Sequence, residues 1–132
     1  MEYPNGGKVY LLRSIDYYNI DENNDALVEM NNALKIDECA INYYFRCLIY
    51  YRLGQFENAL KDINEVIKQK PDRLNHLIMA YMTRGEIYEI QGNFEKAMDD
   101  YEYVMNNAND NYFDKKCKYE KIINLSNKMN KL

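Results

Sequence analysis

The chain has 132 residues and a formal net charge of -4, which is the size of one domain with a slight excess of acid. Acidic and basic residues are interspersed, so no concentrated positive patch of the kind that binds nucleic acid is present in the sequence. Five Gly and two Pro, with both prolines outside the apolar runs, disfavour an all-β or α/β fold. The 14 Tyr, with no Trp, indicate that tyrosine carries much of the packing.

The cysteines and the lack of a long apolar stretch indicate the compartment in which we expect the chain. The three cysteines are an odd number without the spacing of a metal site, and we expect free, buried thiols in a reducing compartment. They are Cys39, Cys47 and Cys117. No stretch approaches the roughly 18 apolar residues that cross a membrane, and no export signal is visible. We expect a soluble, cytoplasmic chain, either complete or part of a larger protein.

The first predicted helical pair spans about residues 7–39. Its first helix contains the motif Tyr-x-x-Arg-small-x-x-Tyr, beginning at Tyr10, whose spacings of three, four and seven place these residues on one helical face. The second helix carries an apolar stripe that begins at Ala26, twelve residues after Ser14. A polar break separates the two helices.

The second and third pairs, about residues 40–73 and 74–111, repeat this pattern. In each copy an alanine follows the small residue by twelve positions, which should let two antiparallel helices pack closely. The small residue and alanine of the three copies are Ser14 with Ala26, Cys47 with Ala59 and Gly85 with Ala97. The stripes of the second helices are Ala26, Met30 and Ala33, then Ala59, Ile63 and Val66, then Ala97, Tyr101 and Val104.

Two details concern the helix ends. Gly54 and Gly92 stand where the end of a helix favours a left-handed residue. The third motif follows the second after 38 residues rather than about 34, and the excess, residues 74–77, predicts one more turn at the start of that helix, near Pro71 or Asp72.

A last helix is predicted from Tyr112 to Asn130, about residues 112–130. Its apolar residues, interspersed among many lysines, are Phe113, Cys117, Ile122, Ile123 and Met129. We expect it to cap the stack of helical pairs, because the ends of a repeat array need a polar outer face.

The three copies resemble the tetratricopeptide repeat (TPR), with its aromatic residue, Leu-Gly and Tyr on one helix, Ala and an aromatic on the next, and a closing proline. The middle copy matches best and ends at Pro71; in all three copies an arginine replaces the usual leucine, and Glu38 and Asn109 replace the proline in the other two. The resemblance implies an all-α fold: a single domain, 1–132, of about seven helices, forming a right-handed superhelical solenoid of antiparallel pairs with a capping helix.

The arginine of each motif has an acidic residue sixteen positions later. The pairs are Arg13 with Glu29, Arg46 with Asp62 and Arg84 with Asp100. We hypothesise that each forms a forked, partly shielded ion pair between the two helices, which would explain how an arginine replaces a leucine. Chance matches in an acid-rich chain are the alternative.

In TPR proteins the first helices line a groove that binds a partner, so the resemblance implies a protein-interaction scaffold or adaptor. The predicted groove residues are Leu11, Ile15, Tyr18, Tyr44, Leu48, Tyr51, Arg52, Met79, Met82, Glu86 and Glu89. Because many are apolar or aromatic, we expect a cover: a partner peptide or helix, a second copy forming a homodimer through the groove, or the last helix of the chain. If the register is off by one, they belong to the core.

Some TPR domains hold the acidic C-terminal carboxylate of heat-shock chaperones with Lys, Asn and Arg. The matching positions here are Leu11, Ile15, Phe45, Met79 and Thr83, none of which is one of those residues. We therefore do not expect a chaperone tail as the ligand. A regulatory or targeting module of a larger enzyme or co-chaperone complex is an alternative function.

No enzymatic motif is recognisable. The single histidine, His76, is expected at a solvated position, and Asp99 and Asp100 are adjacent on a helix and therefore point in different directions. The sequence lacks a zinc-protease motif and a phosphate-binding glycine loop. We expect no catalytic residues, no metal and no cofactor.

Overall fold

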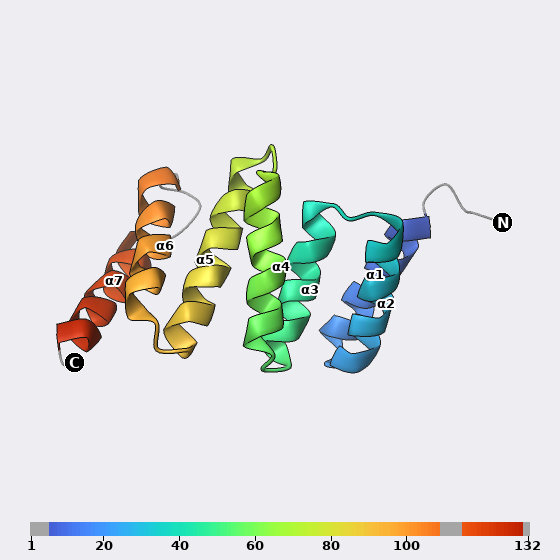
Figure 1. The fold of residues 1–132 in the computed structure, drawn as a ribbon, viewed down its shortest axis with the longest axis horizontal. Coiled ribbons are helices and arrows are strands. Elements are labelled where there is room, and N and C mark those ends of the chain that lie inside the picture. The colour runs from blue at the N-terminus through green and yellow to red at the C-terminus, as the bar shows by residue number, and fades with distance from the viewer. Residues whose placement is uncertain (1–5, 109–114, 131–132) are drawn as a thin grey trace. The chain divides into compact units, whose positions relative to one another are not determined.

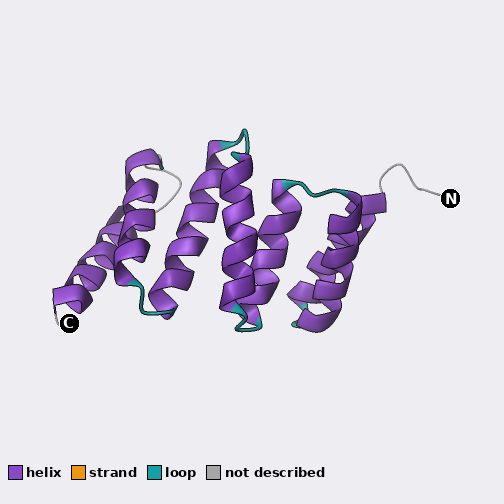
Figure 2. Ribbon diagram, in the orientation of Figure 1, coloured by secondary structure: helices purple, strands orange, loops and turns teal. Residues whose placement is uncertain are grey.

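The computed structural model describes residues 6–108 and 115–130, and in these residues it contains seven α-helices and no strand (Figure 1). The helices are α1 (Gly6–Asn19), α2 (Asn23–Ile36), α3 (Ala40–Arg52), α4 (Phe56–Gln69), α5 (Leu74–Ile90), α6 (Phe94–Asn107) and α7 (Lys115–Asn130). They form two compact units, Met1–Gln69 with α1 to α4 and Lys70–Leu132 with α5 to α7. The predicted all-α class is confirmed, and Figure 2 shows that short turns connect the paired helices.

The turns inside the three pairs share one geometry. Gly54 and Gly92 have φ angles of 75° and 78°, as their positions predicted, and Asp21 occupies the equivalent place in the first pair with a φ of 61°. In each turn a backbone N–H donates to the carbonyl of the last tyrosine of the motif. These bonds run from Glu22 to Tyr17 at 2.9 Å, from Gln55 to Tyr50 at 2.8 Å and from Asn93 to Tyr88 at 2.8 Å.

Close packing between paired helices occurs at the small residues. Ser14 is buried, and its hydroxyl donates to the carbonyl of Ala26 at 2.7 Å. Cys47 is completely buried. At Gly85 a β-carbon would lie 2.7 Å from Cε1 of Tyr101, so in the third copy the tyrosine ring occupies the space beside the glycine.

Each unit has its own buried cluster. In unit 1, α2 and α3 supply Ala26, Met30, Ala33 and Ile49; in unit 2, α6 and α7 supply Ala97, Tyr101 and Leu125. The predicted stripes of the second helices are buried throughout, with no member more than 2% exposed. The period of these stripes therefore identified the core-facing side of α2, α4 and α6.

Of the described helices α5 is the longest, with 17 residues against 14 in α4 and α6. The predicted extra turn is present, but the helix begins at Leu74, two or three residues later than expected. No helix in the described residues combines the length and apolar content needed to cross a membrane.

The last helix and the cysteines differ in detail from expectation. Tyr112 and Phe113 lie outside the described residues, as does the side chain of Cys117. Among the described side chains of α7, Leu125 is buried, although it was not one of the apolar residues named from the sequence, and Ile123 is 56% exposed. The expectation of a buried thiol is wrong for Cys39: this residue precedes the first turn of α3 and is partly exposed, lining a hollow of about 310 Å³.

Candidate functional site

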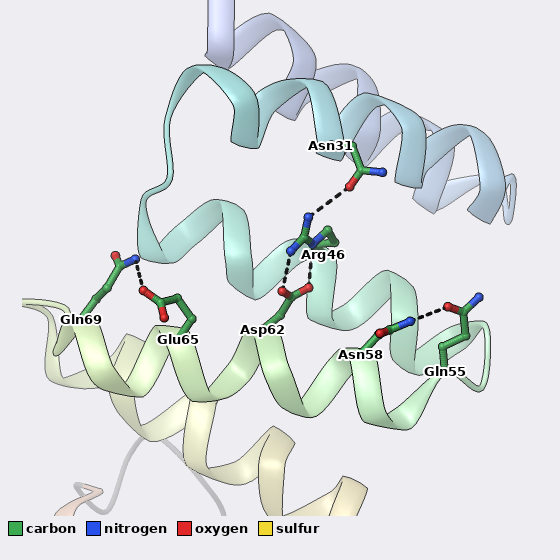
Figure 3. Close-up of polar contacts among 7 residues, drawn as sticks. All are labelled: Asn31, Arg46, Gln55, Asn58, Asp62, Glu65 and Gln69. Atoms are coloured by element: carbon green, nitrogen blue, oxygen red, sulfur yellow. Dashed lines mark hydrogen bonds and ion pairs between the residues drawn. The ribbon is translucent and has the colours of Figure 1, made fainter.

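One guanidinium group joins three helices of unit 1 (Figure 3). Nε and Nη2 of Arg46 each donate to a carboxylate oxygen of Asp62 on α4, both at 2.7 Å, and Nη1 donates to Oδ1 of Asn31 on α2 at 3.2 Å. The rings of Tyr43 and Tyr50 both lie 5.7 Å from the guanidinium carbon, within cation–π range. The two tyrosines of the motif thus flank its arginine, which the sequence analysis did not foresee.

The third pair repeats this arrangement in unit 2. Nε and Nη2 of Arg84 donate to the carboxylate of Asp100 at 2.9 and 2.6 Å. The rings of Tyr81 and Tyr88 lie 5.1 and 5.8 Å from its guanidinium carbon. An arginine, its acidic partner and two flanking tyrosines thus have the same geometry in both pairs. This recurrence indicates that the motif stabilises the contact between the two helices of a pair.

The first pair is looser. Nη2 of Arg13 lies 3.3 Å from Oε1 of Glu29, and this is the one ion pair that Arg13 makes among the described residues. Its side chain is 55% exposed, against 24% for Arg46 and 20% for Arg84. The structure brings together all three arginine–acid pairs named from the sequence, but the fork is present in only two.

Burial and hydrogen bonding shift the ionisation of several of these groups. The hydrogen bond to Asp62 raises the pKa of Arg46. Burial raises the pKa of the Asp100 carboxyl more than the hydrogen bond from Arg84 lowers it. Burial also raises the pKa of the Cys47 thiol far above its ordinary value, so this thiol stays protonated and unreactive at neutral pH. Arg46 and Asp100 each take part in a bond between two helices.

Six residues predicted to line the groove form what we call the tyrosine face of unit 1. They are Leu11, Ile15 and Tyr18 on α1, and Tyr44, Leu48 and Tyr51 on α3. All six are partly exposed, so none belongs to the fully buried core. Leu11 and Tyr18 also pack against the buried cluster, and the ring of Tyr51 makes an edge contact with Phe56 at 5.9 Å. Leu11, Tyr18 and Tyr51 are therefore each held by a contact within unit 1.

Arg52, also predicted to lie in the groove, is engaged within unit 1. Its guanidinium carbon lies 3.4 Å from the ring centre of Tyr18, and Nη1 donates to the carbonyl oxygen of that residue. The same nitrogen lies 3.3 Å from Oδ1 of Asp21. Arg52 thus fastens the end of α3 to the turn between α1 and α2.

The four predicted groove residues of unit 2, Met79, Met82, Glu86 and Glu89, are all partly exposed on α5. Met82 packs against the cluster that includes Leu125 of α7. Glu89 accepts a hydrogen bond from the Tyr101 hydroxyl at 2.9 Å and lies 3.6 Å from Nζ of Lys128 on α7. The last helix therefore contacts Glu89 and shares a cluster with Met82, two of the predicted groove residues, within unit 2.

The positions that match the carboxylate clamp are apolar or buried. Leu11, Ile15 and Phe45 of unit 1 are partly exposed, as is Met79 of unit 2. Thr83 is only 8% exposed. These side chains offer no cation to a terminal carboxylate.

The histidine lies on α5, and the two adjacent aspartates lie on α6. His76 is partly exposed near the start of α5, Asp99 is exposed on α6, and Asp100 is held by Arg84. Among the described residues, no three His, Cys, Asp or Glu side chains lie close enough to hold a metal ion.

Known proteins share the repeat motif and the fold of this chain. The tetratricopeptide-repeat family model matches residues 40–73 and 80–111, which are the second and third copies of the motif. Over 82 residues, or 61% of its length, the chain is 32% identical to DnaJ homolog subfamily C member 3 of Gallus gallus, of which it spans 15%.

Solved structures of low sequence identity share the fold. The first TPR domain of Spaghetti (RPAP3), bound to the HSP90 peptide SRMEEVD, superposes with a TM-score of 0.80 at 19% identity, covering 96% of this chain and 95% of that one. The TPR2B domain of yeast Sti1 in its pHsp70 complex gives a TM-score of 0.80 at 17% identity, covering 93% and 98%. With its repeated motif, its helix pairs and the match of the family model, the chain belongs to the tetratricopeptide-repeat family.

Proposed function

We propose that the chain is a protein-interaction scaffold and that the tyrosine face binds an apolar segment of a partner, either a helix or an extended peptide. The observation that carries this proposal is the partial exposure of six apolar or aromatic side chains at matching positions of α1 and α3. Tyrosine is favoured at binding surfaces because it is rigid and has both an apolar ring and a hydroxyl group. Within unit 2, Met79, Met82 and Glu86 on α5 would be candidate contacts of their own.

The chemistry of the face argues against a chaperone tail as ligand. The Spaghetti domain is bound to a peptide ending in Glu-Glu-Val-Asp, a strongly acidic segment. Here the five matching positions carry no Lys, Arg or Asn, and Arg52 already contacts Tyr18 and Asp21. Affinity would therefore come from burial of apolar side chains, at roughly 25 cal/mol per Å² of apolar area removed from water.

A selection experiment tests the proposal. Peptides that bind the purified chain are selected from a random library, and their affinity is measured by calorimetry for the chain, for Leu48→Glu and for Ile41→Glu. Both substitutions place a charge on α3, but Ile41 lies outside the tyrosine face and is already 42% exposed. We expect Leu48→Glu to weaken binding at least about tenfold, while Ile41→Glu leaves it unchanged. Equal effects, or none at Leu48, would reject the tyrosine face as the site.

A second candidate is a targeting module of a co-chaperone, which is favoured by the 32% identity to a DnaJ homolog. It predicts binding of the chain to an intact Hsp70 or HSP90 chaperone rather than to its acidic tail alone. Titration with each chaperone, and with the peptide SRMEEVD at low salt, distinguishes the two. Binding of the peptide with strong salt dependence would show that our argument against the clamp is wrong.

A further inference from the structure

The outer side of α1 exposes an apolar stripe. We call this surface the end face; its residues are Val9, Leu12, Arg13, Asp16, Tyr17 and Ile20. Three of them, Val9, Leu12 and Ile20, are 47%, 54% and 66% exposed. Successive steps of three and four residues place the first five residues of the end face along one side of α1, and Ile20 follows in the turn directly after the helix, which ends at Asn19.

The equivalent side of α3 is covered. The first and second copies of the motif are 33 residues apart in the sequence. At this offset Val9, Leu12, Asp16 and Ile20 correspond to Asn42, Phe45, Ile49 and Leu53, in that order. Asn42 and Ile49 are 4% and 1% exposed. Phe45 and Leu53 pack against the cluster that contains Met30 of α2, the helix that packs on α3. On α1 this side of the repeat is exposed, which also explains the 55% exposure of Arg13.

The end face is complementary to itself. When two α-helices pack antiparallel about a twofold axis, residues whose numbers have a constant sum lie at the same level along the pair. At the centre of such a packing Arg13 lies opposite Asp16 of the other copy. On the two flanks Leu12 lies beside Leu12 and Tyr17 beside Tyr17 of the other copy, because a residue and its twofold copy stay on the same flank. Two copies of α1 would thus place apolar residues next to apolar residues on both flanks, and each arginine opposite the aspartate of the other copy.

The charges on the end face are only partly engaged within the chain. Arg13 contacts one oxygen of Glu29 rather than forming a fork, and Asp16 is exposed with no ion-pair partner among the described residues. Beside them is a hollow of about 450 Å³, which could receive an apolar side chain. Its lining residues are Arg13, Asp16, Tyr17, Asn19 and Ile20.

We propose that the end face binds a second copy of this chain, forming a twofold dimer in which two α1 helices pack antiparallel. The apolar pairs supply most of the affinity, because exposed ion pairs contribute little, and the Arg13–Asp16 pairs fix the antiparallel register. One helix from each chain buries less than a standard interface, so we expect dissociation at micromolar concentrations or above. The tyrosine face is not used and remains available to a partner.

Solution mass measures the proposed dimer directly. Sedimentation velocity of the 132-residue chain, from about 1 µM to 1 mM, should show a rise from monomer to dimer. Asp16→Arg places like charges opposite each other and should raise the dissociation constant at least tenfold. Asp99→Arg, an exposed site on α6, makes the same change of charge and should have no effect. Monomer at every concentration overturns the proposal.

Charge complementation provides the sharper test. In Asp16→Arg positions 13 and 16 both carry arginine, and in Arg13→Asp both carry aspartate, so each variant alone should be monomeric while an equimolar mixture forms a mixed dimer. Circular dichroism checks that Arg13→Asp, which also loses its contact with Glu29, remains folded. Leu12→Lys, at an already exposed position, should abolish the dimer without that complication. A dimer that survives both Leu12→Lys and Asp16→Arg, or one abolished by Leu48→Glu on the tyrosine face, overturns the proposal.

Discussion

Arg46 shows how a charged side chain takes a place that a leucine usually fills in this family. Its guanidinium finds acceptors on two other helices and a tyrosine ring on each side, so its polar atoms are paired while its stem packs. Such an arrangement is stable only while the carboxylate is present, because removing one partner leaves a shielded charge without compensation.

The degree of shielding should therefore set the cost of neutralising the acid. We expect Asp62→Asn, whose partner Arg46 is 24% exposed, to lower the free energy of unfolding by about 2 kcal/mol. Glu29→Gln should cost less than about 1 kcal/mol, because Arg13 is 55% exposed and is solvated by water. Urea unfolding of the two variants measures both values. Equal losses would contradict the proposed dependence on shielding.

Because the Cys47 thiol is buried, we expect the free energy of unfolding to depend on pH in the alkaline range. Burial raises its pKa in the folded chain above the ordinary value of 9.0, whereas the thiol of the unfolded chain ionises near that value. The folded chain then retains a proton that the unfolded chain releases, so the free energy of unfolding falls as pH rises above about 9.

Comparison with Cys47→Ala isolates this effect from the titration of the tyrosines. The wild-type chain should lose about 1.4 kcal/mol per pH unit relative to the variant above about pH 9. Urea unfolding at several pH values measures the difference between the two proteins. A constant difference from pH 7 to about pH 10.5 would mean that Cys47 is not held protonated in the folded chain.

At the scale of the element, the turns within the pairs differ at the residue with positive φ. Gly54 and Gly92 adopt positive φ without steric cost, but Asp21 adopts the same conformation with a side chain, which is less favourable. We expect Asp21→Gly to raise the free energy of unfolding by about 0.5 kcal/mol, despite loss of the exposed contact with Arg52, and Gly54→Ala to lower it by about 1 kcal/mol.

Thermal unfolding of these two variants gives the sign of each change. A control should introduce glycine close to the turn, and positions inside the following helices, such as 57 and 95, are too far into helical structure for this purpose. Gln91→Gly is the better control: this residue lies next to Gly92 but has a helical backbone, so the substitution should be destabilising. If Gln91→Gly also stabilised the chain, the positive φ of Asp21 would not be the cause of the stabilisation by Asp21→Gly.

At the scale of the whole molecule, the two units should respond separately to damage in their cores. Met30 is completely buried in unit 1 and Leu125 is 1% exposed in unit 2, and each belongs to a cluster of its own unit. In repeat proteins stability is the sum of terms between neighbours.

Hydrogen exchange measured residue by residue checks this expectation. Met30→Ala should reduce amide protection mainly in α1 to α4, and Leu125→Ala mainly in α5 to α7, each substitution costing about 2–5 kcal/mol locally. Equal loss of protection in both units, for both variants, would indicate a single cooperative unit instead.

Much of this fold could be predicted because the motif occurs three times. Alignment of the copies fixed the helix pairs, the buried stripes and the three arginine–acid pairs by counting residues. It could not predict that Arg52 contacts Tyr18, because that contact depends on which way the helix ends face one another in space. The α7 contacts to Glu89 were also missed, since α7 has no copy with which its register could be compared. Ligand binding at the tyrosine face remains a prediction, because the repeat pattern indicates which residues are exposed but does not identify the molecule that binds them.

The hydrogen bond from Arg46 to Asn31 has a consequence for how such a chain can lengthen. In the second repeat, the arginine thus uses an amide on the second helix of the repeat before it. The second repeat carries Asn64, 33 residues after Asn31, at the corresponding place on its own second helix. An in-frame duplication of that repeat would therefore supply the copied arginine with the acceptor it needs, so the array can grow by tandem duplication without a compensating mutation.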